Sequence, residues 1–258
     1  MHQQLTMISI QWDSPDEDKR AKYERLSSLL SRWSERTTLR LNNMSFKDEG
    51  VVMVTHRFQE LQPLQHLQRL ELRSNEIRDR GMGTLCDWIS VSKSPVRHLN
   101  LWNNEIGSEG ASRLARILND SRLEVVNLGK NKIRDQGASH LGLAMERNKV
   151  LLSLNVSENE MTDEGGKSFT SALLSNPFIK EIDISMNNVS ARTARHLREI
   201  LAMRNSGSSN ISQRSTEWIV QEAPKGSFHM EAHQPLFPDP ELEDSLDSLE
   251  EQKSSPHM

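Results

Sequence analysis

One pattern of apolar residues followed by an asparagine recurs along the chain, and it constrains the fold more than any other feature. The stretch Leu67–Ile77 reads LQRLELRSNEI, and the same spacing returns four more times. An earlier, degenerate copy has Met44 in place of the asparagine. The five asparagines, 27 to 29 residues apart, are Asn75, Asn104, Asn131, Asn159 and Asn187. Self-similarity at such a period is the signature of stacked repeats, in which each unit covers the apolar face of the next.

Each repeat contains the signals of a strand, a turn and a helix. Alternating apolar residues such as Leu70 and Leu72 predict a short strand that buries both side chains on one face. The asparagine follows where the chain leaves the strand, and we expect its amide to pair turn backbone groups that would otherwise be buried unpaired. An acid and a glycine then open roughly 12–16 residues of helical period, and the acid complements the helix dipole. These glycines are Gly50, Gly81, Gly110, Gly137 and Gly165.

The pattern LxxLxLxxNxI, with a period of about 28 residues and a full helix in each repeat, resembles the leucine-rich repeats of the ribonuclease-inhibitor type. The resemblance covers roughly residues 35–204, about two-thirds of the chain. It implies an α/β solenoid, a horseshoe with a parallel β-sheet on the concave face and helices on the convex face. It also implies that a protein partner binds on the concave sheet and the adjoining loops.

We expect three segments: a capping strand and helix in 1–36, about six repeats in 37–204, and a mostly disordered acidic tail in 205–258. A solenoid exposes its core at both ends unless an atypical unit covers it. Residues 1–36 fit such a cap or a degenerate first repeat, and a separate docking helix is the alternative. Residues 215–221 are the one strand-like run of the tail, and they favour equally a capping strand and a loose partner-binding peptide.

The acidic tail differs sharply from the rest of the chain in charge. Residues 205–258 hold three Lys/Arg and ten Asp/Glu, a net charge of −7, whereas residues 1–204 carry +3. Five of the nine prolines also fall in the tail, which is typical of a solvated, disordered segment. Two alternatives stay open: an amphipathic helix around Leu242, Leu246 and Leu249 that forms on binding, and an autoinhibitory contact with the basic part of the sheet.

Composition excludes several classes of protein. A single cysteine, Cys86, excludes a disulfide framework and any multi-cysteine zinc site. No apolar run approaches the ~18 residues of a membrane span, and the first residues lack the features of a signal peptide. The charge balance does not favour nucleic acid. We therefore expect a cytoplasmic monomer that contacts neither membranes nor nucleic acid and whose partner is another protein.

The side chains between the buried leucines should point to the concave surface, because neighbours along a strand face opposite sides. Basic residues gather in the early repeats and acids in the late ones. Trp102 is the sharpest signal, since Trp and Arg dominate interface hot spots, and we hypothesise that it anchors a partner. The alternative is that Trp102 lies flat over its neighbours and binds nothing. The candidate partner-binding residues are Arg40, Arg69, Glu71, Arg73, His98, Asn100, Trp102, Asn103, Lys130, Glu158 and Asp183.

No constellation of residues favours catalysis, a cofactor or a metal. Cys86 lies on a helical stretch without an adjacent base, which favours a buried structural thiol. His229 and His233 are spaced like a zinc motif, but the glutamate between them is one position off. The sequence thus predicts a non-enzymatic protein–protein interaction scaffold.

One catalytic activator remains as the alternative. The body followed by an acidic tail is similar in outline to the Ran GTPase-activating protein, in which a functional arginine lies in a loop after an early strand. The matching loop here, Asn42–Lys47, contains no arginine. Only Arg40 or Arg73 could substitute for it.

Overall fold

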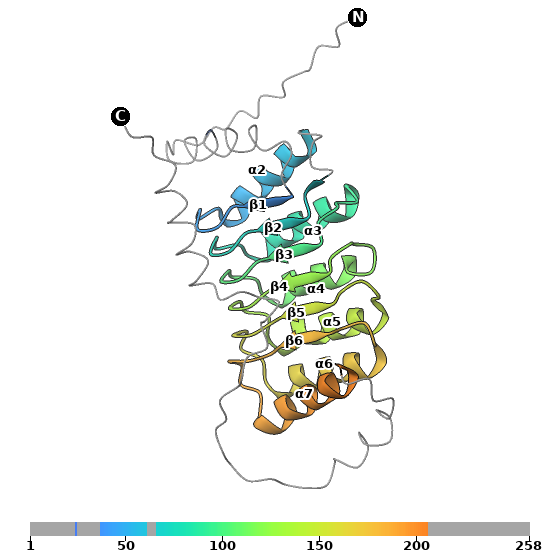
Figure 1. Cartoon of the computed structure of the whole chain (residues 1–258). Coiled ribbons are helices and arrows are strands. Elements are labelled where there is room, and N and C mark those ends of the chain that lie inside the picture. Colours follow the sequence, from blue (N-terminus) through green and yellow to red (C-terminus); the bar gives the residue numbers. More distant parts are fainter. Residues whose placement is uncertain (1–23, 25–36, 61–65, 206–258) are drawn as a thin grey trace, which may run out of the picture.

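The computed structural model describes residues 24, 37–60 and 66–205, and within them strands and helices alternate without exception (Figure 1). The three-residue strands are β1 (Thr38–Arg40), β2 (Arg69–Glu71), β3 (His98–Asn100), β4 (Val125–Asn127), β5 (Ser153–Asn155) and β6 (Glu181–Asp183). The helices are α2 (Lys47–Glu60), α3 (Asp79–Val91), α4 (Ser108–Ile117), α5 (Arg134–Arg147), α6 (Asp163–Ser175) and α7 (Ala191–Asn205). The α/β solenoid expected from the repeats is confirmed.

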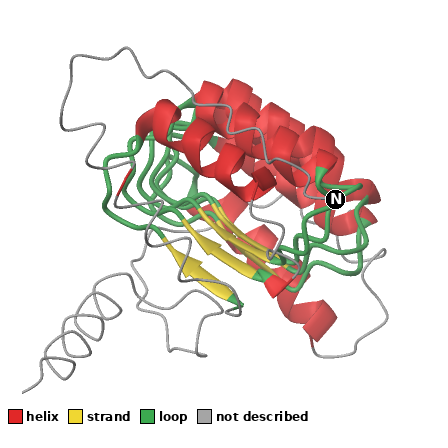
Figure 2. Cartoon of the chain, turned by 90° about the horizontal axis from the view of Figure 1, so that it is seen from above, coloured by secondary structure: helices red, strands yellow, loops and turns green. Residues whose placement is uncertain are grey.

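The strands form one parallel sheet in chain order, from β1 to β6. The register places equivalent positions of successive repeats side by side, so that Leu70 lies opposite Leu39 on one side and Leu99 on the other. The helices all cover one face of this sheet (Figure 2). We call the opposite face, which the sequence predicts to be concave, the sheet face.

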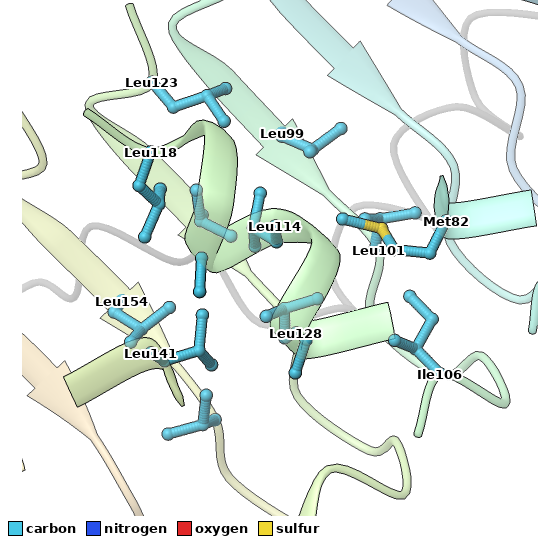
Figure 3. Packing of buried hydrophobic residues seen from close by; sticks show 14 of the residues in the cluster. Met82, Leu99, Leu101, Ile106, Leu114, Leu118, Leu123, Leu128, Leu141 and Leu154 are labelled. Atoms are coloured by element: carbon cyan, nitrogen blue, oxygen red, sulfur yellow. The ribbon is translucent and has the colours of Figure 1, made fainter. Parts of the chain in front are cut away.

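The core lies between the sheet and the helices and runs continuously through the repeats. Leu99, Leu114 and Leu128 are at most 1% exposed. Figure 3 shows leucines of three successive repeats in one cluster. Burying one such side chain stabilises the fold by about 1.5–3 kcal/mol, and no repeat can bury its own leucines alone. Stacking is therefore the main source of stability.

Each recurring asparagine joins its own turn to that of the preceding repeat. Asn131 Oδ1 accepts a hydrogen bond from the Ile106 backbone N–H at 3.0 Å. Its Nδ2 donates to the carbonyls of Leu101 and Leu128 at 3.0 and 2.9 Å. Asn131 is 5% exposed, so these backbone groups have no water as an alternative partner. The predicted role of the asparagine is confirmed.

The acids at the helix starts act on the next helix as well as on their own. Asp79, the first residue of α3, accepts hydrogen bonds from the backbone N–H groups of Gly107 and Gly110 at 2.6 and 2.9 Å. It thereby caps α4, whose first N–H groups have no partner within the helix. A Cβ at Gly110 would lie 2.7 Å from this carboxylate oxygen, which explains the recurring glycine. Asp135 makes the equivalent bonds to Thr162 and Gly165.

The expected cap in 1–36 falls outside the described residues, apart from Glu24, and so do 206–258 with the proposed capping strand 215–221. In the part of the chain that the structure describes, no helix has the length and apolar character that crossing a membrane requires.

Candidate protein-binding surface

The sheet register places six of the eleven predicted binding residues in two columns that run across the strands. Arg40, Glu71 and Asn100 are successive partners in one column, which ends at Asp183 on β6. Arg69 and His98 are partners in the column beside it. Residues far apart in the sequence thus lie side by side, because each repeat adds one strand to the same sheet.

A chain of contacts joins the early residues of this surface. Arg69 Nη1 lies 3.9 Å from Glu71 Oε1, and Glu71 Oε2 accepts a hydrogen bond from Asn100 Nδ2 at 2.7 Å. Asn100 Oδ1 in turn accepts from the Trp102 backbone N–H at 3.1 Å. The Lys130 ammonium lies 4.9 Å from the centre of the Trp102 ring, within the range of a cation–π contact. We call these five residues the Trp102 cluster.

Trp102 lies two residues after the end of β3 and is half-buried. Its ring lies against Gly129, the equivalent position of the next repeat: a Cβ there would be 2.8 Å from Trp102 Cδ1. The ring therefore rests on its neighbours, as the flat-lying alternative expects, and still presents part of its surface. The glycine at position 129 is the sequence signal for this packing, because any larger residue would displace the ring.

Other predicted residues are used mainly to hold the sheet face together. Glu71 and Arg73 are buried, at 6% and 4% exposed. Asn103 Nδ2 donates to Ser74 Oγ at 2.8 Å. Asp183 Oδ1 accepts from the Ser185 backbone N–H at 2.9 Å, as Asn100 does for Trp102.

The remaining predicted residues are spread along the sheet. Arg40 is exposed on β1, the first strand. Glu158 and Asp183 are half-buried in the last two repeats, away from the Trp102 cluster. The structure thus brings Arg69, Glu71, Asn100, Trp102 and Lys130 into contact and leaves the acidic residues at the other end.

His98 is half-buried among charged groups. Burial lowers the pKa of its imidazole, and Arg69 and Arg97 lower it further, while Glu124 acts in the opposite direction. These effects favour the neutral imidazole over the imidazolium.

Sequence reasoning missed a polar hollow beside the Trp102 cluster. It has a volume of about 470 Å³ and opens among the loops that follow β2, β3, β4 and β5. Asn103 and Lys130 line it together with Lys132, Glu105 and Glu160. The signal lay in the residues directly before and after each repeating asparagine, where Lys130 and Lys132 flank Asn131.

The thiol of Cys86 lies in the core and not on the sheet face or in the hollow. Its side chain is 2% exposed within α3, and burial raises its pKa to about 12, with a further contribution from Asp87. A thiol with so high a pKa forms little thiolate at neutral pH and is therefore a poor nucleophile. The interpretation of Cys86 as a buried structural thiol is confirmed. Among the described residues, no group of three His, Cys, Asp or Glu side chains is placed to hold a metal ion.

Four segments of the chain, residues 64–86, 92–115, 121–142 and 147–169, match the family described as Leucine Rich repeat. The chain is a leucine-rich repeat protein of the ribonuclease-inhibitor type. It is 34% identical over 73 residues to the ribonuclease inhibitor of Mus musculus, a match that covers 28% of this chain and 16% of the inhibitor.

One further curated relative and one solved structure also match parts of the chain. A protein phosphatase 1 regulatory subunit 37 homolog of Caenorhabditis briggsae is 30% identical over 80 residues, 29% of this chain and 9% of that protein. The chain thus matches less than a fifth of the length of these two curated relatives. Among solved structures, leiomodin-1 actin-binding site 2 gives a TM-score of 0.43 at 13% identity, covering 79% of this chain and 98% of that one.

Proposed function

We propose that this protein is a non-enzymatic scaffold that binds a partner protein on the sheet face, with Trp102 as the anchor. The observation that carries the proposal is the position of Trp102: it is partly exposed, its ring rests on Gly129 and Lys130, and its backbone is held by Asn100. A rigid, partly exposed tryptophan supplies a large contact area at little conformational cost, which is why Trp is frequent in hot spots.

The relatives give independent support. Their names describe a ribonuclease inhibitor and a regulatory subunit of a phosphatase, and both roles require one protein to bind another. With a single cysteine the chain has no disulfide framework, as is usual for proteins of reducing compartments, and we propose that it acts in the cytoplasm.

Affinity capture tests this proposal. The full chain, the Trp102→Ala variant and a truncation at Asn205 are each immobilised, and the proteins captured from a native lysate are compared by quantitative mass spectrometry. We expect at least one abundant partner that the wild type captures and Trp102→Ala does not. The matched control is Leu143→Ala, which removes an apolar side chain that is 61% exposed on α5, on the helix side. Equal capture by wild type and Trp102→Ala would contradict the proposal.

The alternative, a GTPase activator, makes a different prediction. An activator needs an arginine that reaches the nucleotide of its partner. Arg73 is buried, which leaves the exposed Arg40 as the candidate. Hydrolysis of GTP by a panel of small GTPases should stay at its basal rate when the protein is added. Acceleration that Arg40→Ala abolishes would establish the activator instead.

A further inference from the structure

The hollow beside Trp102 indicates what kind of partner the sheet face takes. Resting on the proposed function, we infer that this hollow binds a carboxylate side chain in an acidic segment of the partner protein, with Lys130 as the cation that receives it.

The first step is that the glutamates of the hollow are already neutralised. Glu76, Glu105 and Glu160 all line it, and each forms an ion pair with a basic residue. The pairs are Glu76–Lys47 at 3.6 Å, Glu105–Arg78 at 2.7 Å, Glu105–Lys132 at 3.8 Å and Glu160–Arg134 at 3.0 Å. Three carboxylates are thus opposed by four cations before Lys130 is counted.

The second step is that the Lys130 ammonium forms no ion pair with any acid of the described residues. The side chain is exposed, while its backbone is fixed by a hydrogen bond from its N–H to the Ser157 carbonyl at 2.8 Å. The charged residues that line the hollow, taken with the cations outside it that pair with its glutamates, therefore carry a net charge of +2. The Lys130 ammonium among them lies over the face of the Trp102 ring.

The third step concerns the shape of the anion. Phosphate is typically recognised by guanidinium groups that are free to bind it in a bidentate manner. The two guanidinium groups beside the hollow, those of Arg78 and Arg134, are already paired with Glu105 and Glu160. A single ammonium next to an indole suits a monoanion on a short apolar stem instead. Asp and Glu side chains have this form, with methylene groups for the ring and a carboxylate for Lys130.

A selection from a library of random heptapeptides displayed on phage, against the immobilised full chain, tests the inference. We expect the selected peptides to be enriched in Asp and Glu relative to the unselected library. A synthetic copy of one such peptide should lose at least tenfold in affinity when Lys130 is changed to Glu, as measured by fluorescence polarisation. It should lose a similar amount when its own acids are replaced by the corresponding amides.

Two features of the chain make the Lys130→Glu variant interpretable. Lys130 has a left-handed backbone with φ 54°, and Glu158 occupies the equivalent position of the next repeat with φ 51°, so glutamate fits this turn. Lys149→Glu makes the same change of charge at an exposed residue in the loop between α5 and β5, away from the hollow. We expect Lys149→Glu to change the affinity by less than twofold.

Several results would overturn the inference. The first is a selection that yields no peptide, or peptides without enrichment in Asp and Glu. The second is an equal loss of peptide affinity in Lys130→Glu and Lys149→Glu. The third is tighter binding of the peptide when phosphoserine replaces its acid. A variant in which the ten acids of residues 205–258 are changed to Asn or Gln tests the chain's own tail as the occupant. If this variant bound the peptide tenfold more tightly, the tail and not a partner would be the segment that occupies the hollow. Peptides that need Trp102 but neither acids nor Lys130 would leave the proposed scaffold intact while removing this inference.

Discussion

The side chain of Asn104 holds the backbone of Ile77, 27 positions earlier in the chain, through a hydrogen bond of 3.0 Å from the Ile77 N–H to its Oδ1. The same oxygen accepts from the Asn75 N–H at 3.0 Å, and Nδ2 donates to the Leu72 carbonyl at 3.0 Å. One amide therefore pairs three backbone groups of the preceding repeat. Because these backbone groups are buried, removing the amide would leave them without any hydrogen-bond partner, which costs more free energy than a typical hydrogen bond contributes.

Asn104→Ala should lower the free energy of unfolding by about 2–4 kcal/mol, because buried N–H and carbonyl groups are left without partners. Urea unfolding followed by circular dichroism measures the change. Asn119→Ala is the control: this asparagine is exposed after α4, and its loss should change stability by less than about 0.5 kcal/mol. Equal midpoints for the two variants would contradict the account of the asparagine turns.

Gly110→Ala and Gly83→Ala should have opposite effects, although both glycines lie inside helices. A Cβ at Gly110 would lie 2.7 Å from Asp79 Oδ1 and from Ile106 Cγ2, so the cap must shift at a cost of about 1–3 kcal/mol. A Cβ at Gly83 meets nothing within 4 Å, so alanine should stabilise the protein by about 0.5–1 kcal/mol. Differential scanning calorimetry of the two variants checks the signs, and destabilisation by both would contradict the prediction.

The fold was predictable because the same physical requirement recurs in each repeat. Leu70, Leu99 and Leu154 must all be covered by a neighbour, so the spacing that buries one of them buries the others. The link from Asp79 to the next helix was not predictable from one repeat alone. Asp79 and Gly110, whose N–H donates to the carboxylate, lie 31 residues apart, and only the stacking of repeats brings them together.

The binding surface was predictable as a set of columns but not as a site. Alternation along the strands placed Arg69, His98 and Asn100 on one face, and the register confirms those columns. Alternation does not reveal which side chains bind each other rather than a partner, and Glu71, which accepts a hydrogen bond from Asn100, is buried. The hollow lies among loops whose left-handed residues, such as Asn103 and Lys130, escape any rule based on strand periodicity.

Protonation of Asp135 should weaken the cap of α6. Burial raises the pKa of this carboxyl, but hydrogen bonds from the Thr162 hydroxyl and backbone and from the Gly165 N–H outweigh it, so the pKa lies below its ordinary value of 3.8. Because the native pKa is lower than the unfolded one, the stabilisation is present above about pH 4 and is lost as the pH falls through the native pKa.

Asp135→Asn should therefore be less stable than the wild type at pH 7, by about 1–2 kcal/mol, and the difference should shrink below pH 4. Urea midpoints between pH 2.5 and 7 measure it. Thr162→Val removes the hydroxyl donor, together with the long bond that this hydroxyl accepts from the Glu164 N–H, and keeps the backbone donor to Asp135. Its loss at pH 7 should therefore be the smaller of the two. A gap between wild type and Asp135→Asn that stays constant with pH would count against the cap.

Acidification should destabilise the sheet face through His98. Burial and the nearby Arg69 and Arg97 lower the pKa of His98 below 6.5, against the opposing effect of Glu124. Between the native and the unfolded pKa the unfolded chain binds more protons, so stability decreases as the pH is lowered through 6.5.

Titration of the imidazole by NMR should give a native pKa below 6.5, and Arg69→Gln should raise it by removing a neighbouring cation. The His98→Gln variant should lose less stability than the wild type between pH 7.5 and 5.5. A measured pKa at or above 6.5, or one insensitive to Arg69→Gln, would show that the charges of this face do not act on His98 as the structure indicates.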